Sequence, residues 1–233
     1  MSILSMLPQQ CVLCGHSLSA ASGICAPCQH DLPWPMSPCH RCGIELGPEP
    51  PVHRYCGSCL AEPPAFDRCF AAFRYEYPVR ELIANFKFDG RFAEGQTLAQ
   101  LLADFVFGAY QPERRPGCLL PVPLHPRRLR ERGYNQSMEL ARAVGRRCHI
   151  PVAAQYCRRI RSTPSQKGLS ADERAVNLRN AFSLERGTFV DPPDHIAIID
   201  DVVTTMATVS AIARLLRTAG HRRIDVICLA RVS

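Results

Sequence analysis

The chain has 233 residues, of which 46% are hydrophobic and 21% charged, and its formal net charge is +7. This length is enough for one α/β domain and a small additional module. It contains no segment that approaches the roughly 20 consecutive apolar residues of a transmembrane helix. Residues 1–10 also lack the basic start and long apolar core of a secretory signal. We therefore expect a cytoplasmic protein.

The first quarter of the sequence contains four Cys-x-x-Cys pairs. Two thiolates at this spacing can turn around one Zn²⁺, and two pairs joined by a short hairpin complete a tetrahedral Cys₄ site. Pairing in chain order predicts two zinc ribbons, although crosswise pairing is also compatible with the sequence. Gly15 and Gly43 each follow a pair directly and fit knuckle turns with positive φ. The eight predicted zinc ligands are Cys11, Cys14, Cys25, Cys28, Cys39, Cys42, Cys56 and Cys59.

A disulfide framework is the competing interpretation of these cysteines. It requires an oxidising compartment, whereas paired cysteines in the cytoplasm indicate zinc. Five other cysteines have no partner at this spacing, and most of them are expected to be buried free thiols that pack as small hydrophobic side chains. These are Cys69, Cys118, Cys148, Cys157 and Cys228.

The charge of the cysteine-rich segment bears on its role. Residues 1–62 contain only two of the chain's 28 lysines and arginines, but four of its 21 carboxylates. A ribbon that bound nucleic acid by neutralising phosphates would be expected to carry its own cations. We therefore predict a structural or docking role for the ribbons. The proline-rich stretch that starts at Glu62 suggests a boundary, with a double zinc ribbon at 1–62 and a second domain at 63–233.

Residues 63–233 show the pattern of an α/β domain. Short apolar runs indicate strands at residues 66–75, 119–122, 196–199 and 224–229. Apolar side chains at one-face spacing indicate helices at residues 94–107, 135–147 and 209–216. Gly220 stands where the C-terminal cap of the last helix belongs. Strands that alternate with helices predict a mainly parallel, doubly wound sheet, in which ligands bind at the carboxyl ends of the strands.

A basic loop follows the strand predicted at 119–122. It carries four arginines before a helix for which Asn135 is a suitable N-cap. Guanidinium groups suit polyanions such as pyrophosphate, whereas a solvated surface loop is the alternative. A histidine beside prolines is equally compatible with phosphate binding and with a structural role. The candidates for pyrophosphate binding are His125, Arg127, Arg128 and Arg132.

The most informative segment is 196–208, where an apolar run ends in Asp200 and Asp201 and a hydroxyl-rich turn then opens a helix. A helix N-terminus presents free N–H groups and a positive dipole end to an anion. This order predicts a site for a phosphorylated sugar, with the carboxylates as hydroxyl acceptors. An ordinary βα unit with a capped helix is the alternative. The predicted phosphate-binding residues are Val202, Thr204, Thr205, Met206, Ala207 and Thr208.

This segment resembles the phosphoribosyl pyrophosphate (PRPP) motif of type I phosphoribosyltransferases. The resemblance implies that Asp200 and Asp201 hold the ribose 2′- and 3′-hydroxyls while the following loop holds the 5′-phosphate. It also implies displacement at ribose C1, with pyrophosphate leaving, with Mg²⁺ bound and with an unidentified acceptor. Met206 stands where that family usually has glycine, which permits positive φ and close backbone approach. This residue therefore bears on the strength of phosphate binding.

Three motifs together with the cysteine pairs resemble the ComF family. They are 121–128 (Pro-Val-Pro-Leu-His-Pro-Arg-Arg), 132–136 (Arg-Gly-Tyr-Asn-Gln) and 166–177. The resemblance implies a double zinc ribbon joined to a phosphoribosyltransferase domain. Some members are linked to natural competence and to incoming single-stranded DNA, so competence or DNA-processing proteins are implied partners.

Residues 158–174 correspond in position to the mobile hood of type I phosphoribosyltransferases. Such a segment closes to exclude water from the reacting sugar. Arg161, Gln166 and Lys167 are the candidates here for contacts with pyrophosphate or the incoming base. The alternative for this basic segment is contact with a nucleic acid backbone.

A binding protein is the second hypothesis. Such a protein would keep the sugar-phosphate pocket to sense a phosphoribosyl ligand or to bind single-stranded DNA, for which the basic excess of residues 63–233 is suitable. Met206 favours this hypothesis slightly, and the intact acidic pair favours the enzyme.

Overall fold

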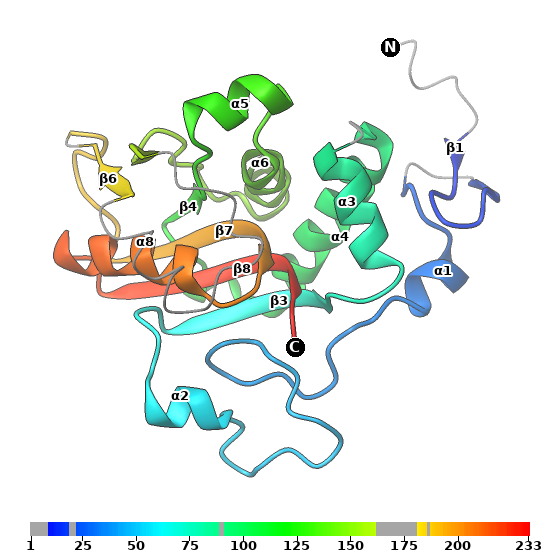
Figure 1. Cartoon of the computed structure of the whole chain (residues 1–233), viewed down its shortest axis with the longest axis horizontal. Coiled ribbons are helices and arrows are strands. Elements are labelled where there is room, and N and C mark those ends of the chain that lie inside the picture. The colour runs from blue at the N-terminus through cyan, green and yellow to red at the C-terminus, as the bar shows by residue number, and fades with distance from the viewer. Residues whose placement is uncertain (1–8, 19–21, 89–90, 162–180, 186) are drawn as a thin grey trace.

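A sheet of four parallel strands, in the order β3-β8-β7-β4, forms the centre of the molecule (Figure 1). The computed structural model describes residues 9–18, 22–88, 91–161, 181–185 and 187–233. The predicted mainly parallel sheet is confirmed. Its strands are β3 (Arg68–Arg74), β4 (Cys118–Pro121), β7 (His195–Val203) and β8 (Arg223–Arg231).

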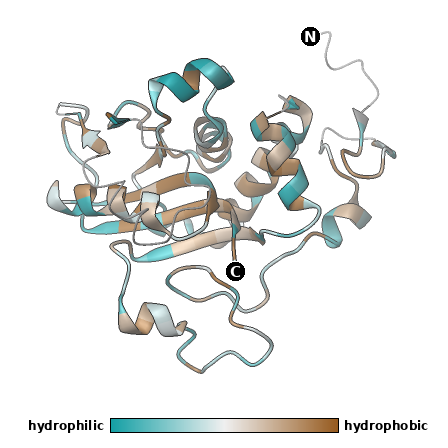
Figure 2. Ribbon diagram, viewed as in Figure 1, coloured by the Kyte–Doolittle hydropathy of each residue, from teal (hydrophilic) through white to brown (hydrophobic). Residues whose placement is uncertain are grey.

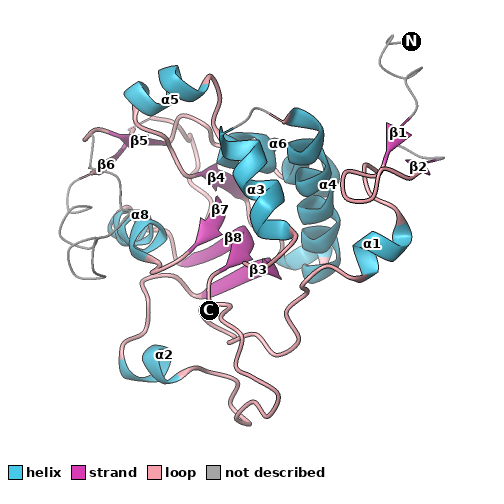
Figure 3. Ribbon diagram, turned by 45° about the vertical axis from the view of Figure 1, so that its right-hand side comes forward, coloured by secondary structure: helices cyan, strands magenta, loops and turns pink. Residues whose placement is uncertain are grey.

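Helices cover both faces of this sheet (Figure 3). In β7, Ala197 and Ile199 belong to the core cluster on one face, whereas Ile196 and Ile198 belong to the cluster on the other. This alternation follows from the two-residue repeat of a strand, and apolar side chains on both sides make the sheet predominantly hydrophobic (Figure 2). The predicted doubly wound arrangement is therefore confirmed. The first face carries α3 (Val79–Phe88), α4 (Phe92–Ala109) and α6 (Gln136–Cys148), and the second carries α8 (Ala207–Thr218).

Two boundaries in the domain differ from the sequence predictions. The strand predicted to end at residue 199 continues to Val203, because Val202 and Val203 still pair with β8. The acidic pair therefore lies inside a strand. The segment predicted as a basic loop contains α5 (Pro126–Arg132). Pro126 fits the first helical turn, His125 caps the start, and Gly133 ends the helix with a φ of 83°.

Several short elements and α3 were not predicted. A two-stranded antiparallel sheet pairs β5 (Cys157–Arg159) with β6 (Phe182–Leu184). A 3₁₀ helix, η2 (Pro112–Arg114), follows α4. Helix α3 was missed although its buried side chains, at 79, 82, 83 and 86, have one-face spacing. None of the described helices is both long and apolar enough to cross a membrane.

The cysteine pairs form two ribbons, a first ribbon at residues 9–32 and a second ribbon at residues 37–61. The first contains β1 (Gln9–Gln10), β2 (Ser17–Leu18) and α1 (Ala26–His30), and it packs on α4. A Cβ at Gly23 would lie 2.0 Å from Oγ1 of Thr97, so this contact requires glycine. The second contains α2 (Gly57–Ala61) and lies along β3 near the C-terminus (Figure 1). The division of the chain at residue 62 stays a prediction.

Candidate functional site

Each ribbon brings four cysteine sulfurs together, with every sulfur within 4.8 Å of the others. A tetrahedral zinc site with Zn–S bonds of about 2.3 Å places its sulfurs about 3.8 Å apart. The Cys14 and Cys25 sulfurs are 3.7 Å apart, and those of Cys42 and Cys56 are 3.6 Å apart. All thirteen cysteines are free thiols, so no disulfide competes. The clusters are two Cys₄ zinc-binding sites, and they follow chain order rather than crosswise pairing.

The same local design builds both zinc sites. The first pair of each ribbon sits in a knuckle turn, and Gly15 and Gly43 adopt the expected positive φ of 72° and 71°. The second pair stands at the start of a short helix, with Cys25 and Cys56 as the N-cap residues of α1 and α2. The N–H of Cys56 also donates to the sulfur of Cys39 at 3.3 Å. The five unpaired cysteines are all buried, as predicted.

The acidic pair lies near the carboxyl end of β7 and is half-buried. Asp201 pairs with Nζ of Lys87, at the end of α3, at 2.9 Å. Asp200 accepts hydrogen bonds from the Ser137 hydroxyl at 3.2 Å and from the N–H of Asp201 at 2.9 Å. Burial and the neighbouring charge of Asp201 raise the pKa of Asp200 to about 7. Such a carboxyl group can accept or donate a hydrogen bond near neutral pH.

The start of α6 supports this arrangement. The side-chain oxygen of Asn135 accepts from the N–H of Ser137 at 3.0 Å, and its amide nitrogen donates to the carbonyl of Val122 at 3.0 Å. Asn135 is thus the predicted N-cap, and it also ties α6 to the segment after β4. The Ser137 hydroxyl reaches Asp200 because of this connection.

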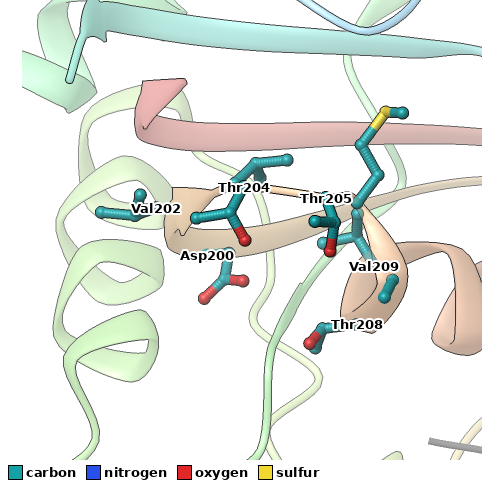
Figure 4. A pocket seen from close by; sticks show the side chains of 9 residues that line it. Asp200, Val202, Thr204, Thr205, Thr208 and Val209 are labelled. Atoms are coloured by element: carbon teal, nitrogen blue, oxygen red, sulfur yellow. The ribbon is translucent and has the colours of Figure 1, made fainter. Parts of the chain in front are cut away.

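An open hollow adjoins the acidic pair. It is lined by Asp200 and residues 202–209, which span the end of β7 and the first residues of α8. Figure 4 shows the Asp200 carboxylate and the hydroxyls of Thr204, Thr205 and Thr208 turned towards the same space. The N-cap residue of α8 supplies no side-chain hydrogen bond to the helix. The first N–H groups of any helix have no intrahelical acceptor, and here no N-cap side chain accepts from them, so they can donate to an anion in the hollow.

Met206, the N-cap residue of α8, has a φ of 64° and a ψ of 0°. This is the left-handed conformation that glycine adopts without steric cost. Met206 thus has a backbone conformation that is typical of glycine, although it carries a long side chain. That side chain packs against the cysteine cluster of the second ribbon.

The four predicted pyrophosphate candidates lie at the N-cap of α5 and along this helix. His125 is its N-cap, with Nδ1 accepting from the N–H of Arg127 at 3.3 Å, and its role in phosphate binding stays a prediction. Arg127 pairs with Glu131 at 2.9 Å, and Arg132 donates to Gln136 at 2.7 Å. Of the proposed hood residues, Arg161 is exposed two positions after β5, while Gln166 and Lys167 lie outside the described residues.

Three residues near the acidic pair were missed by the sequence analysis: Lys87, Ser137 and Arg159. Burial and the charge of Arg128 lower the pKa of Arg159, while Asp200 acts in the opposite sense. The charge of Arg159 thus interacts with both Arg128 and Asp200. No local pattern singles out these residues, because they come from α3, α6 and β5, which are distant from the acidic pair in sequence.

Known proteins resemble this chain over nearly its full length. Competence protein F of Haemophilus influenzae is 37% identical over 226 residues, which cover 95% of this chain and 96% of that protein. The chain belongs to the ComF family. Residues 3–60 also match the family model of a double zinc ribbon domain.

Two other relatives match the chain to different extents. The DNA utilization protein YhgH of Escherichia coli K12 is 36% identical over 228 residues, covering 97% of this chain and 98% of that protein. Competence protein ComFC of Streptococcus pneumoniae is 26% identical over 163 residues, or 69% of this chain and 67% of that protein. The similarity to YhgH extends across both ribbons and the α/β sheet.

Proposed function

We propose that this ComF protein binds PRPP and transfers its phosphoribosyl group to an acceptor, in the context of DNA uptake. The observation that carries the proposal is the hollow lined by Asp200 and residues 202–209. It joins the Asp200 carboxylate, hydroxyls and a helix N-terminus at the carboxyl end of a parallel sheet, which is where ligands bind in such folds. The names of the relatives, competence protein and DNA utilization protein, support the context. A cytoplasmic location remains a prediction.

The acidic pair would orient the sugar. Two adjacent carboxylates on one strand can accept hydrogen bonds from the two neighbouring hydroxyls of a ribose. Nζ of Lys87 forms an ion pair with one carboxylate oxygen of Asp201 at 2.9 Å. This ion pair would hold the carboxylate in place before the sugar binds. The 5′-phosphate would bind the N–H groups of residues 204–208, with help from the positive end of the α8 dipole.

The pyrophosphate would face the basic residues near α5. The charge of Arg159 interacts with both Arg128 and Asp200, and we place the leaving group beside Arg128 and Arg159, with Arg127, Arg132 and the hood residue Arg161 as further cations. Carboxylate oxygens at the hollow are suitable for Mg²⁺. When bound with PRPP, this ion would reduce repulsion between pyrophosphate and ribose oxygens.

The reaction would be a displacement at ribose C1. A bond from the acceptor to C1 forms, the bond from C1 to the pyrophosphate oxygen breaks, and the bond electrons leave with pyrophosphate. The chain's contribution is the orientation of sugar and phosphate by fixed groups rather than covalent chemistry. Asp200 and Asp201 are the proposed catalytic residues. The acceptor is not identified by any described residue.

Isothermal titration of PRPP with Mg²⁺ into the zinc-loaded protein tests this function. We expect micromolar binding by the wild type and its loss in an Asp200→Asn/Asp201→Asn variant, because an amide is a weaker acceptor for the ribose hydroxyls. Asp194→Asn is the matched control, since this exposed aspartate lies at the opposite end of the sheet and pairs with Arg222. Absence of binding by the folded wild type would refute the proposal.

The alternative is a catalytically inactive protein that binds single-stranded DNA or senses a phosphoribosyl ligand. It is favoured by Met206, a bulky residue at a position where phosphoribosyltransferases usually have glycine, and by the four arginines of α5. A salt titration of single-stranded DNA affinity tests the DNA-binding form. Several released counterions would give a steep dependence on salt. A shallow dependence with weak affinity would exclude it.

A further inference from the structure

One buried guanidinium connects the second ribbon to the phosphate loop, defined here as residues 203–208. Arg231 ends β8 and is 7% exposed. Its Nε donates to the carbonyl oxygen of Cys42, a zinc ligand, at 3.0 Å. Its Nη1 donates to the carbonyl of Val203 at 3.1 Å and also to the carbonyls of Thr204 and Val232. A single side chain therefore holds the knuckle and the start of the loop against each other.

These hydrogen bonds set the direction of the loop amides. In a planar trans peptide, the C=O and the N–H point to opposite sides. Because Arg231 binds the carbonyls of Val203 and Thr204, the N–H groups of Thr204 and Thr205 are turned away from the guanidinium. Both residues line the hollow. Arg231 thus favours the orientation in which the loop offers donors to an anion.

Met206 makes a second connection between the same two parts. Its side chain packs against the cluster of Cys39, Cys42 and Cys59. Its left-handed φ of 64° is sparsely populated by residues other than glycine, and such a conformation persists only where its surroundings enforce it. The packing of the Met206 side chain against the second ribbon stabilises this backbone conformation. The Met206 side chain therefore connects the phosphate loop to the second ribbon.

The first ribbon has no such role in the described structure. Cys11, Ile24 and Leu32 pack in the cluster that contains Leu98 and Leu102 of α4. The contact between Gly23 and Thr97 belongs to the same interface. Its zinc site is also more open, since Cys14 is exposed, whereas three of the four ligands in the second ribbon are buried. The chain therefore contains an internal control for the second site.

We propose that the second zinc site positions the phosphate loop, with Arg231 and Met206 as positioning residues. Loss of zinc from this ribbon then weakens sugar-phosphate binding, whereas loss from the first ribbon does not. This inference rests on the proposed function for its ligand, but the order of the loop can be measured without any ligand.

The matched variants are Cys56→Ser in the second ribbon and Cys14→Ser in the first. Each removes one of four zinc ligands, and a zinc assay should show the loss of one ion per chain. Amide hydrogen exchange of residues 203–209 is then measured by mass spectrometry. We expect exchange to accelerate by about tenfold or more in Cys56→Ser and to stay unchanged in Cys14→Ser. Protection of β4 in both variants reports that the sheet is intact.

Variants that keep all eight zinc ligands address the connection itself. Lysine cannot replace the branched donors of Arg231, so Arg231→Lys should accelerate loop exchange with zinc content unchanged. Met206→Gly removes the packing and should do the same, whereas Met206→Leu retains an apolar side chain and should restore protection. If Cys56→Ser fails to fold, these variants still test whether the second ribbon positions the phosphate loop.

PRPP titration separates this inference from the proposed function. We expect affinity to fall by about tenfold or more in Cys56→Ser and Arg231→Lys, and to be unchanged in Cys14→Ser. If the wild type does not bind PRPP but only the second-ribbon variants loosen the loop, the coupling stands and the proposed function fails. Equal loop exchange in Arg231→Lys, Met206→Gly and the wild type would overturn the coupling, whatever the affinity for PRPP.

Discussion

The two ends of the parallel sheet each hold an aspartate that is at least half-buried, but the surroundings of the two side chains shift their pKa values in opposite directions. At the amino end, Asp225 of β8 is fully buried and accepts from the Tyr110 hydroxyl at 2.7 Å, His195 at 2.9 Å and Arg223 at 3.2 Å. Although burial opposes ionisation, hydrogen bonds from His195 and Tyr110 lower the pKa of Asp225. At the carboxyl end, burial and Asp201 raise the pKa of Asp200 to about 7.

This difference distinguishes a structural carboxylate from a binding carboxylate. Three donors converge on one oxygen of Asp225, and the side chain joins β7, β8 and the end of α4. Asp200 has few donors, a like charge beside it and an open hollow in front. An unfavourable charge arrangement of this kind is typical of functional sites, where a ligand supplies the missing partners.

The largest expected effect is at the amino end. Asp225→Ala should destabilise the fold by about 3–5 kcal/mol, because it leaves His195, Arg223 and the Tyr110 hydroxyl without their buried acceptor. Urea unfolding of the zinc-loaded protein measures this. Asp194→Ala is the control, since Asp194 forms an exposed ion pair with Arg222 at the same end and should have no measurable effect. A loss below about 1 kcal/mol in Asp225→Ala would contradict the structural role.

A smaller effect, of opposite sign, is expected at the carboxyl end. The folded pKa of Asp200 lies above its unfolded value of about 3.9, so the folded state binds the extra proton between these values. Its contribution to stability is therefore present at low pH and is lost as the pH rises towards 7. Asparagine does not ionise, so Asp200→Asn does not lose stability as the pH rises. The variant should be more stable than the wild type by about 1–2 kcal/mol at pH ~8, with little difference below pH ~4.

Unfolding free energies at pH ~4, ~6 and ~8 measure this prediction. Asp225→Asn is the opposing control, because the lowered pKa of Asp225 means that its ionised form stabilises the fold above its unfolded pKa. That variant should lose stability at pH ~8. If Asp200→Asn were less stable than the wild type at this pH, the ionised Asp200 carboxylate would not be destabilising in the folded protein.

Local sequence signals predicted the strands of the sheet and the caps of two helices. They did not predict the contacts between the ends of the sheet and the rest of the chain. The apolar runs of β4, β7 and β8, the Asn135 cap and the positive φ of Gly220 all follow from residues close in sequence. The cysteine pairs predicted both zinc sites for the same reason. These features depend on backbone geometry and on short-range spacing.

The surroundings of the acidic pair depend on tertiary packing instead. Lys87 and Asp201 are 114 positions apart, and their contact requires α3 to lie against the end of β7. Arg231 reaches Cys42 across 189 positions. No single-sequence pattern encodes such pairs. For α5 the signal was present, since Pro126 and Gly133 bound the helix, but its charged sequence has no apolar face that indicates a helix.

The smallest expected effect concerns Lys87, which lies 2.9 Å from Asp201 and favours the ionised form of Asp200. Lys87→Gln should raise the pKa of Asp200 further, because it removes a cation that favours the ionised carboxylate. The ¹³C chemical shift of the Asp200 carboxyl group, followed against pH, measures this change.

Arg80→Gln is the matched control for Lys87→Gln, since Arg80 is a cation on the same helix whose partner is the exposed Glu81. It should leave the Asp200 titration unchanged. The Asp225 titration should be insensitive to both variants, because its donors come from the opposite end of the sheet. A downward shift for Asp200 in Lys87→Gln would mean that the lysine does not support its ionisation. The contrast between the two carboxylates would then depend on burial and Asp201 alone.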